Sequence, residues 1–133
     1  MSRPGLNGIH HLKVPVSDLG RSRSWYERVL GFTVVLEFAD DGVVRGVGGT
    51  VDGLGDTMLA LREDKGAAAA LSGFDPIALC VPGRDCLRAW ADHLDELGVP
   101  HTPPVQATAG WLIATDDPDG THILFYSPDA PIG

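Results

Sequence analysis

The strongest constraint on the fold of this chain is an internal repeat. Residues 11–16 (HLKVPV) align with residues 76–81 (PIALCV), and the same offset places Trp25 on Trp90. A match that holds at one offset over this length is typical of a duplicated supersecondary unit. The sequence therefore predicts two copies of one module.

The two copies also match beyond this first stretch. After a shift of two residues, residues 30–32 (LGF) fall on residues 97–99 (LGV), and at a third offset residues 56–61 fall on residues 120–125. A leucine, a glycine and an apolar residue in succession are typical of a helix end, because glycine adopts the left-handed conformation favoured just after the last turn. Each copy is therefore expected to carry one helix that ends at this glycine.

Each copy is predicted to form a strand, a helix and three further strands. Residues 11–16 and 76–81 alternate between apolar and other side chains, as in a strand with one buried face. An amphipathic helix follows, near residues 20–30 in the first copy with Asp18 as its N-cap, and with an apolar stripe from Leu87 to Leu97 in the second. The remaining strands are expected at 33–38, 43–48, 57–62, 102–105, 111–115 and 121–126.

Two such modules resemble the vicinal oxygen chelate superfamily, which includes glyoxalase I, bleomycin-resistance proteins and extradiol dioxygenases. The resemblance rests on the string VSDLGRSRSWYERVLGF after the first strand and on DPDG before the last. It covers essentially the whole chain, taken as a single domain over residues 1–133 with modules at about 7–63 and 73–128. It implies an α+β fold in which two βαβββ modules form a curled eight-stranded mixed sheet around a cavity.

The resemblance also implies a homodimer, because members of the superfamily usually complete their cavities with a second subunit. Whether the two subunits exchange modules or pair side by side is left open by the sequence.

The resemblance identifies four positions that decide whether a metal can bind. Metal-dependent members hold a divalent ion with ligands, typically His and Glu, from the first and last strand of each module. The corresponding residues here are His11, Ala60, Pro76 and Leu124. Three of these side chains have no donor atom, whereas a catalytic metal needs about three protein ligands. We therefore predict no metal and no other cofactor, and leave open whether His11 and His122 form a residual weak metal site.

The face of each strand that points away from the helices is predicted to line the cavity. Its side chains are mostly apolar or small, with a few polar groups among them, a composition suited to a bulky and largely apolar ligand. No catalytic residue is assigned, and Cys80 is interpreted as an unreactive thiol. The expected ligand-binding residues are His11, Lys13, Met58, Ala60, Arg62, Pro76, Ala78, Cys80, Trp111, His122, Leu124 and Tyr126.

Two functions remain open for such a cavity. The first is a metal-independent protein that binds a bulky apolar or aromatic natural product, such as an antibiotic, and confers resistance by sequestering it. The alternative is an enzyme of the same superfamily, a glyoxalase-like lyase or isomerase or a dioxygenase-like protein, that uses His11 and His122 in acid-base roles.

Charge and composition exclude several other classes of partner. The formal net charge of −8 would repel nucleic acid and anionic lipid, and no run of apolar residues reaches the roughly 20 needed for a membrane helix. The residues near Met1 show no secretory leader pattern, so a cytoplasmic location is expected. The glycine-rich segment 42–55 is interpreted as a flexible hairpin and loop, or alternatively as a lid over the ligand.

Overall fold

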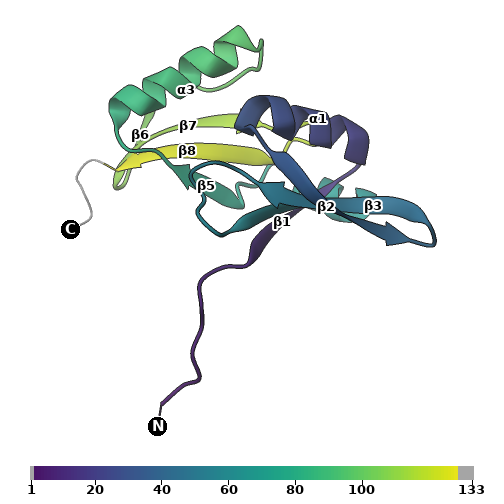
Figure 1. Cartoon of the computed structure of the whole chain (residues 1–133). Coiled ribbons are helices and arrows are strands. Elements are labelled where there is room, and N and C mark those ends of the chain that lie inside the picture. The colour runs from purple at the N-terminus through teal and green to yellow at the C-terminus, as the bar shows by residue number, and fades with distance from the viewer. Residues whose placement is uncertain (1, 129–133) are drawn as a thin grey trace. The chain divides into compact units, whose positions relative to one another are not determined.

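The computed structural model describes residues 2–128, which form two compact units divided between Ala68 and Ala69. Each unit contains one four-stranded mixed sheet (Figure 1). The division falls in the stretch that separates the two predicted modules. The repeated α+β architecture inferred from the sequence is confirmed.

The first unit is a βαβββ module. Its elements are β1 (His11–Val16), α1 (Leu19–Leu30), β2 (Thr33–Asp40), β3 (Val43–Thr50) and β4 (Met58–Glu63). The strand order is β1-β4-β3-β2, with β1 parallel to β4 and the other pairs antiparallel. Helix α1 packs on β4 and buries Tyr26 and Val29.

The ends of α1 are those predicted from the sequence. The Asp18 carboxylate accepts a hydrogen bond of 3.0 Å from the Arg21 backbone N–H, which satisfies one of the unpaired donors of the first turn. Gly31 ends the helix with φ of 69°, a value that costs glycine little because it has no Cβ. The corresponding glycine of the second unit, Gly98, has the same φ.

The second unit repeats this order after an additional short helix. Its elements are β5 (Ile77–Cys80), α3 (Arg84–Glu96), β6 (Val105–Ala107), β7 (Gly110–Asp116) and β8 (His122–Pro128), and the strand order is β5-β8-β7-β6. Helix α3 packs on β7 and β8, where the Trp90 ring stacks on Phe125 with 4.5 Å between ring centroids. The additional helix α2 (Lys65–Leu71) was not predicted, and it occupies the segment between the two modules.

One prediction about the strands becomes more specific and another needs correction. The eight predicted strands are arranged as two four-stranded mixed sheets, one in each unit. The strand expected at 102–105 begins only at Val105, and before it only His101 makes an isolated bridge, to Thr115. Pro103 and Pro104 explain this late start, because proline donates no ladder hydrogen bond.

The glycine-rich segment 42–55 is largely a strand rather than a loop. Asp41 and Gly42 both have positive φ and form the tight turn between β2 and β3. Gly46 and Gly48 lie within β3, where an added Cβ would come within 3.3 Å of Phe38 and 3.0 Å of Leu36. The glycines therefore make room for large side chains of the neighbouring strand.

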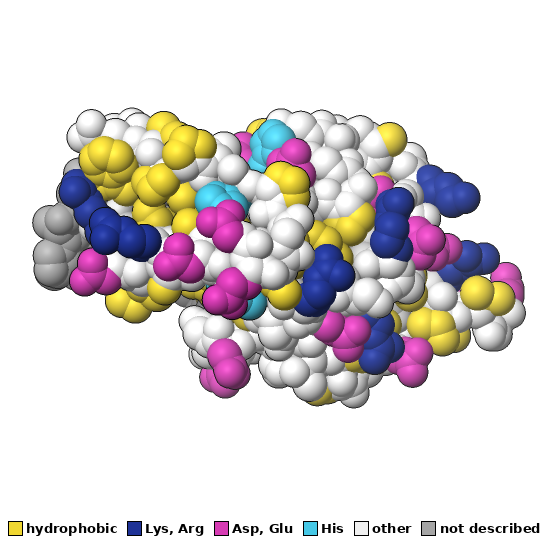
Figure 2. Space-filling view, turned by 90° about the horizontal axis from the view of Figure 1, so that it is seen from above, with side chains coloured by type: hydrophobic (Ala, Val, Ile, Leu, Met, Phe, Trp, Pro, Cys, Tyr) yellow, Lys and Arg dark blue, Asp and Glu magenta, His cyan; other side chains and the backbone are white. Residues whose placement is uncertain are grey.

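No helix in residues 2–128 is long and apolar enough to cross a membrane. Figure 2 shows acidic and basic side chains interspersed over the face that it presents, with no continuous basic stripe.

Candidate functional site

The predicted cavity-lining residues of the first unit share one face of its sheet. His11 is the register partner of Met58, and Lys13 is that of Ala60, so each pair points to the same side. Arg62 follows two residues after Ala60 and returns to that side. Leu59 and Leu61 alternate with them and are buried on the side of α1. The five predicted residues of β1 and β4 therefore share a face, and their role in lining a ligand cavity stays a prediction.

Two further residues on this face were missed by the sequence analysis. Leu36 and Phe38 extend from β2 over Gly48 and Gly46, their register partners in β3. The two side chains remain 38% and 47% exposed, so they form an open apolar floor. The alternating glycines of β3 are the signal that could have identified them, because a residue without a side chain leaves its neighbour room to lie flat.

A pocket of about 510 Å³ opens beside this floor. Arg62 is held there by Asp40, with 2.5 Å between Nη2 and Oδ2. The lining therefore combines an apolar surface with cationic and anionic side chains. It consists of Lys13, Glu37, Phe38, Ala39, Asp40, Ala60, Leu61 and Arg62.

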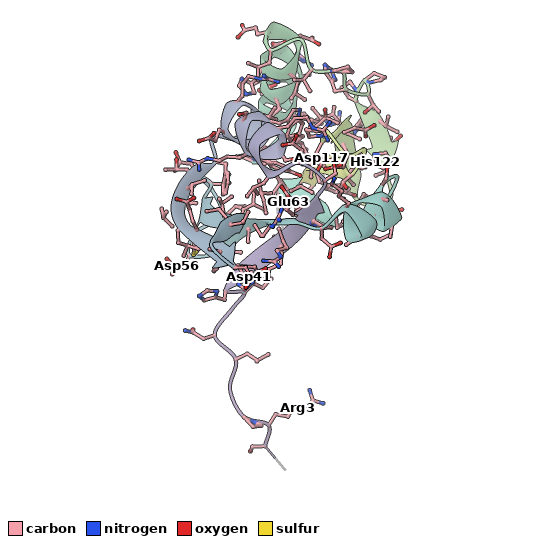
Figure 3. All side chains as sticks on the ribbon, turned by 90° about the vertical axis from the view of Figure 1, so that its right-hand side faces the viewer. Arg3, Asp41, Asp56, Glu63, Asp117 and His122 are labelled. Carbon is pink, nitrogen blue, oxygen red and sulfur yellow. The ribbon has the colours of Figure 1, made fainter. Side chains whose placement is uncertain are left out.

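Near this sheet, one carboxylate connects the end of β4 to the start of α1. Glu63, which is labelled in Figure 3, accepts hydrogen bonds from the Leu19 backbone N–H at 3.1 Å and from Arg45 at 2.6 Å. The hydrogen bond from Leu19 has the largest effect on the pKa of Glu63 and lowers it below its ordinary value. The hydrogen bond from Arg45 lowers it further. Glu63 therefore stabilises the fold in its charged form and is not a candidate proton donor.

The corresponding face of the second sheet is more apolar. Leu124 has Ala78 as its register partner on one side and Ala114 on the other. Tyr126 is paired in the same way with Cys80 and Leu112, and its hydroxyl accepts a hydrogen bond from the Ala109 backbone N–H at 3.0 Å. Ala78, Cys80, Leu124 and Tyr126 therefore share one face of this sheet, and their role in lining a ligand cavity stays a prediction. Leu112 and Ala114 belong to this face and were missed.

Trp111 does not belong to this face, and the prediction that it lines the same surface as Leu124 is wrong. Its register partner is Ser127, which is fully buried on the side that α3 covers. The Arg84 guanidinium lies 4.5 Å from the centre of the Trp111 ring. The indole lines a separate pocket of about 230 Å³ together with Arg84, Leu87, Arg88 and Pro104.

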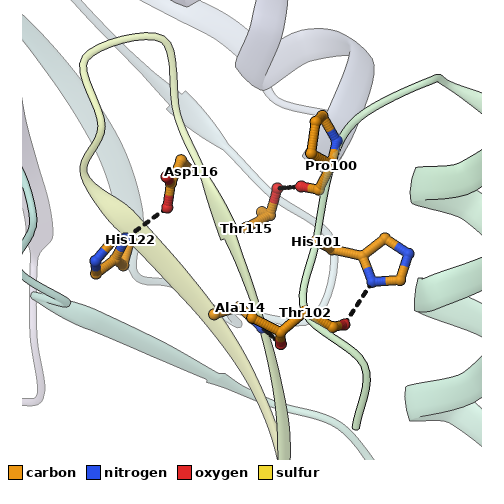
Figure 4. Close-up of a pocket in the computed structure, with 7 residues that line it drawn as sticks. All are labelled: Pro100, His101, Thr102, Ala114, Thr115, Asp116 and His122. Atoms are coloured by element: carbon orange, nitrogen blue, oxygen red, sulfur yellow. Dashed lines mark hydrogen bonds and ion pairs between the residues drawn. The ribbon is translucent and has the colours of Figure 1, made fainter.

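A second pocket of about 510 Å³ lies at one end of this sheet (Figure 4). His122 and Asp116 are register partners, and their Nδ1 and Oδ1 atoms are 2.5 Å apart. The segment 100–102 runs beside β7 and forms the opposite wall. The lining consists of Pro100, His101, Thr102, Ala114, Thr115, Asp116 and His122.

Both ring nitrogens of His101 are occupied by protein acceptors. Nδ1 lies 2.6 Å from the Thr102 carbonyl oxygen, and Nε2 lies 2.7 Å from Oδ1 of Asp95. The hydrogen bond to Thr102, with a further contribution from Asp95, raises the pKa of His101 against the opposing effect of burial. His101 is therefore an anchor between α3 and the segment beside β7, and its ring has no nitrogen to offer a ligand.

The residues at the family's four metal positions do not fit a metal ion. Ala60 is paired with Lys13, and Leu124 lies between Ala78 and Ala114, so neither position has a donor beside it in its own sheet. Pro76, just before β5, has no donor of its own. His11 has its Nδ1 2.9 Å from Nδ1 of His10. Among residues 2–128 no group of three or more His, Cys, Asp or Glu side chains could hold a metal ion.

The two cysteines are both free thiols. Cys80 is exposed at the end of β5, and Cys86 is half-buried on α3. Cys80 therefore lies on the open face of the second sheet, where it adds a small apolar surface.

Comparison with known proteins places this architecture in a family. The sequence profile of the Glyoxalase/Bleomycin resistance protein/Dioxygenase superfamily matches residues 8–125. No curated protein matches the chain in sequence.

Three solved structures illustrate the range of proteins with this fold. TnmS3, an antibiotic binding protein from Streptomyces sp. CB03234, is 23% identical, with a TM-score of 0.76 over 96% of this chain and 100% of that one. Lactoylglutathione lyase from Agrobacterium tumefaciens is 16% identical, with a TM-score of 0.74 over 93% and 96%. The fosfomycin resistance protein FosX from Listeria monocytogenes is 13% identical, with a TM-score of 0.69 over 92% and 94%. At these identities the similarity concerns the fold alone.

Proposed function

This chain belongs to the Glyoxalase/Bleomycin resistance protein/Dioxygenase superfamily, and within it we propose a metal-independent protein that binds a bulky apolar or aromatic small molecule. Its biological role on this proposal is resistance, by sequestering a natural product such as an antibiotic. The ligand would lie on the sheet faces that point away from the helices.

One observation carries the proposal. The face of the second sheet presents Ala78, Leu112, Ala114 and Leu124 at neighbouring register positions, so its centre is apolar and offers no acid, base or metal ligand. The first sheet adds Leu36 and Phe38, both partly exposed. Partly exposed apolar surface of this kind favours an apolar ligand, because binding removes that surface from water.

The similar structures include a protein that binds an antibiotic. TnmS3 is described as an antibiotic binding protein. The fold is therefore compatible with binding as a function in its own right.

An enzyme of the same superfamily is the second candidate. The observation in its favour is the contact between His122 and Asp116, because a carboxylate that orients an imidazole is common in acid-base catalysis. His11, the other histidine of this hypothesis, contacts His10 instead. Lactoylglutathione lyase shows that the fold is also compatible with this class.

We also propose a homodimer as the functional form, and a cytoplasmic location stays a prediction. The supporting observation is the amount of apolar side chain left open on β2 and β3. Val35 and Val43 are 59% and 47% exposed. A partner subunit that covered them would remove this surface from water.

The proposed function can be tested with pyrene, a flat polycyclic hydrocarbon, as the probe. Saturating pyrene should raise the melting temperature, since a ligand at a hundredfold excess over its Kd stabilises by about 2.7 kcal/mol. Ala78→Glu should abolish this effect by placing a carboxylate on the apolar face. Ala70→Glu, at an exposed position of α2, is the matched control and should keep it.

The proposed role in resistance can be tested in living cells. Expression of the chain should allow a sensitive host to grow in the presence of a polycyclic antibiotic, and expression of Ala78→Glu should not. Turnover of the compound by the purified protein would instead support the enzyme.

A further inference from the structure

We propose that His122, held by Asp116, is a hydrogen-bond acceptor for a hydroxyl group on the ligand, so that the pocket of Figure 4 selects phenols and other hydroxylated aromatic compounds. This inference rests on the proposed binding function and specifies the class of compound that the protein binds.

The sheet itself brings the two side chains together. Asp116 ends β7 and His122 begins β8, and the two residues are directly paired across the antiparallel ladder. Paired residues of this kind point to the same face, so the contact between Nδ1 and Oδ1 follows from the strand register. The carboxylate is 60% exposed and the imidazole 37%, so both groups are open to a ligand.

The contact decides which ring nitrogen of His122 carries the proton. An ionised carboxylate can only accept hydrogen bonds, so the neutral imidazole must donate from Nδ1. Nε2 then carries the lone pair and can accept a hydrogen bond from a ligand. A hydroxyl group can donate to it, whereas an ether or a ketone cannot.

The other polar groups of this pocket are already bonded within the protein. The Thr115 hydroxyl donates to the Pro100 carbonyl oxygen at 2.7 Å, and the Thr102 hydroxyl accepts from the Ala114 backbone N–H at 3.0 Å. His101 is bonded through both nitrogens. Among the lining residues the pair formed by His122 and Asp116 is therefore the polar group best placed to bind a ligand.

The apolar part of the pocket adjoins this acceptor. Ala114 precedes Asp116 by two residues on the same face of β7, and Leu124 follows His122 in the same way on β8. An aromatic ring on the surface formed by Ala114 and Leu124 would bring a hydroxyl at its edge toward Nε2. The pocket volume of about 510 Å³ lies within the usual range for small-molecule sites.

A pair of matched probes tests the inference, namely 1-hydroxypyrene and 1-methoxypyrene, which differ only in the hydrogen-bond donor. Fluorescence titration of the intact protein should give about tenfold tighter binding of the hydroxyl compound. His122→Leu should bring the two affinities to within about twofold of each other. Asp116→Asn should also reduce the preference, because an amide can donate to Nδ1 and no longer fixes the tautomer.

Two controls separate this inference from a structural effect. Asp92→Asn removes one negative charge, as Asp116→Asn does, but on α3. This variant should keep the tenfold preference for the hydroxyl compound. Nitrogen NMR of the wild-type protein should show that the neutral ring of His122 carries its proton on Nδ1.

Equal binding of the two probes by the wild-type protein, or a proton on Nε2 of His122, would overturn the inference and leave the proposed function standing. Failure of both probes and of pyrene to bind would overturn the proposed function as well.

Discussion

The Arg84 guanidinium lies 4.5 Å from the centre of the Trp111 ring, on the side of the second sheet that α3 covers. This cation-π contact joins the first residue of α3 to the second residue of β7. Trp111 therefore contributes to the packing of helix on sheet, on the side opposite the proposed ligand.

We predict that Trp111→Ala lowers stability and leaves ligand binding nearly unchanged. Removing the ring deletes its packing and the contact with Arg84, and should lower the free energy of unfolding by about 3 kcal/mol. Pyrene affinity, measured where the variant is folded, should stay within about twofold of the wild-type value. Weak pyrene binding together with unchanged stability would place the ligand on the α3 side of the sheet.

The internal repeat was sufficient to predict which residues of β1, β4, β5 and β8 share a face. The alignment of the two copies identifies the equivalent positions of these strands, and each face then follows from the period of two. Lys13 and Leu124 could therefore be placed from the sequence.

The face of Trp111 could not be derived in the same way. Its orientation depends on the register between β7 and β8, which is set where Asp116 pairs with His122 across a loop of five residues. A shift of one residue in that register exchanges the two faces. For the same reason the pairing of Asp116 with His122 was not foreseen.

We predict that Gly49→Ala severely destabilises the first sheet. An added Cβ would lie 2.0 Å from the Thr33 carbonyl oxygen, which is fixed in the backbone of β2. The strands would have to separate, at a cost of about 3 kcal/mol in the free energy of unfolding. Gly5→Ala is the control, because nothing lies within 4 Å of that position, and chemical denaturation should show no change.

We predict that metal ions do not contribute to stability. Only one of the family's four metal-ligand positions carries a donor side chain, because the other three are Ala60, Pro76 and Leu124. Protein purified without chelator should therefore contain far less than one equivalent of zinc, nickel, iron or manganese. Addition of a chelator should leave the melting temperature unchanged, because no bound metal stabilises the native state. Stoichiometric metal in elemental analysis would contradict this and favour the enzyme.

We predict that the chain is a dimer in solution at micromolar concentration. Light scattering should give twice the chain mass of 14.1 kDa. Val35→Lys, on the open surface of β2, should shift the protein toward the monomer by placing a charge in the apolar contact. Lys65→Glu, a charge change on α2, should leave the dimer intact. A monomeric wild-type protein would remove the support for a subunit interface on this surface.

We predict that stability falls as the pH rises through the pKa of His101. Both ring nitrogens contact acceptors, the Thr102 carbonyl oxygen and the Asp95 carboxylate, so the charged ring is favoured in the folded state and its pKa is raised. In the unfolded chain this histidine titrates at its ordinary, lower pKa.

The stabilisation is therefore fully present below that unfolded value and is lost progressively as the pH rises through the folded pKa. Urea denaturation should give a free energy of unfolding for His101→Gln that is lower than the wild-type value in mild acid, and the difference should shrink in mild alkali. Asp95→Asn should show a smaller version of the same trend, because the hydrogen bond to Thr102 remains. A difference between wild type and His101→Gln that is constant with pH would mean that the ring acts through packing rather than through its charge.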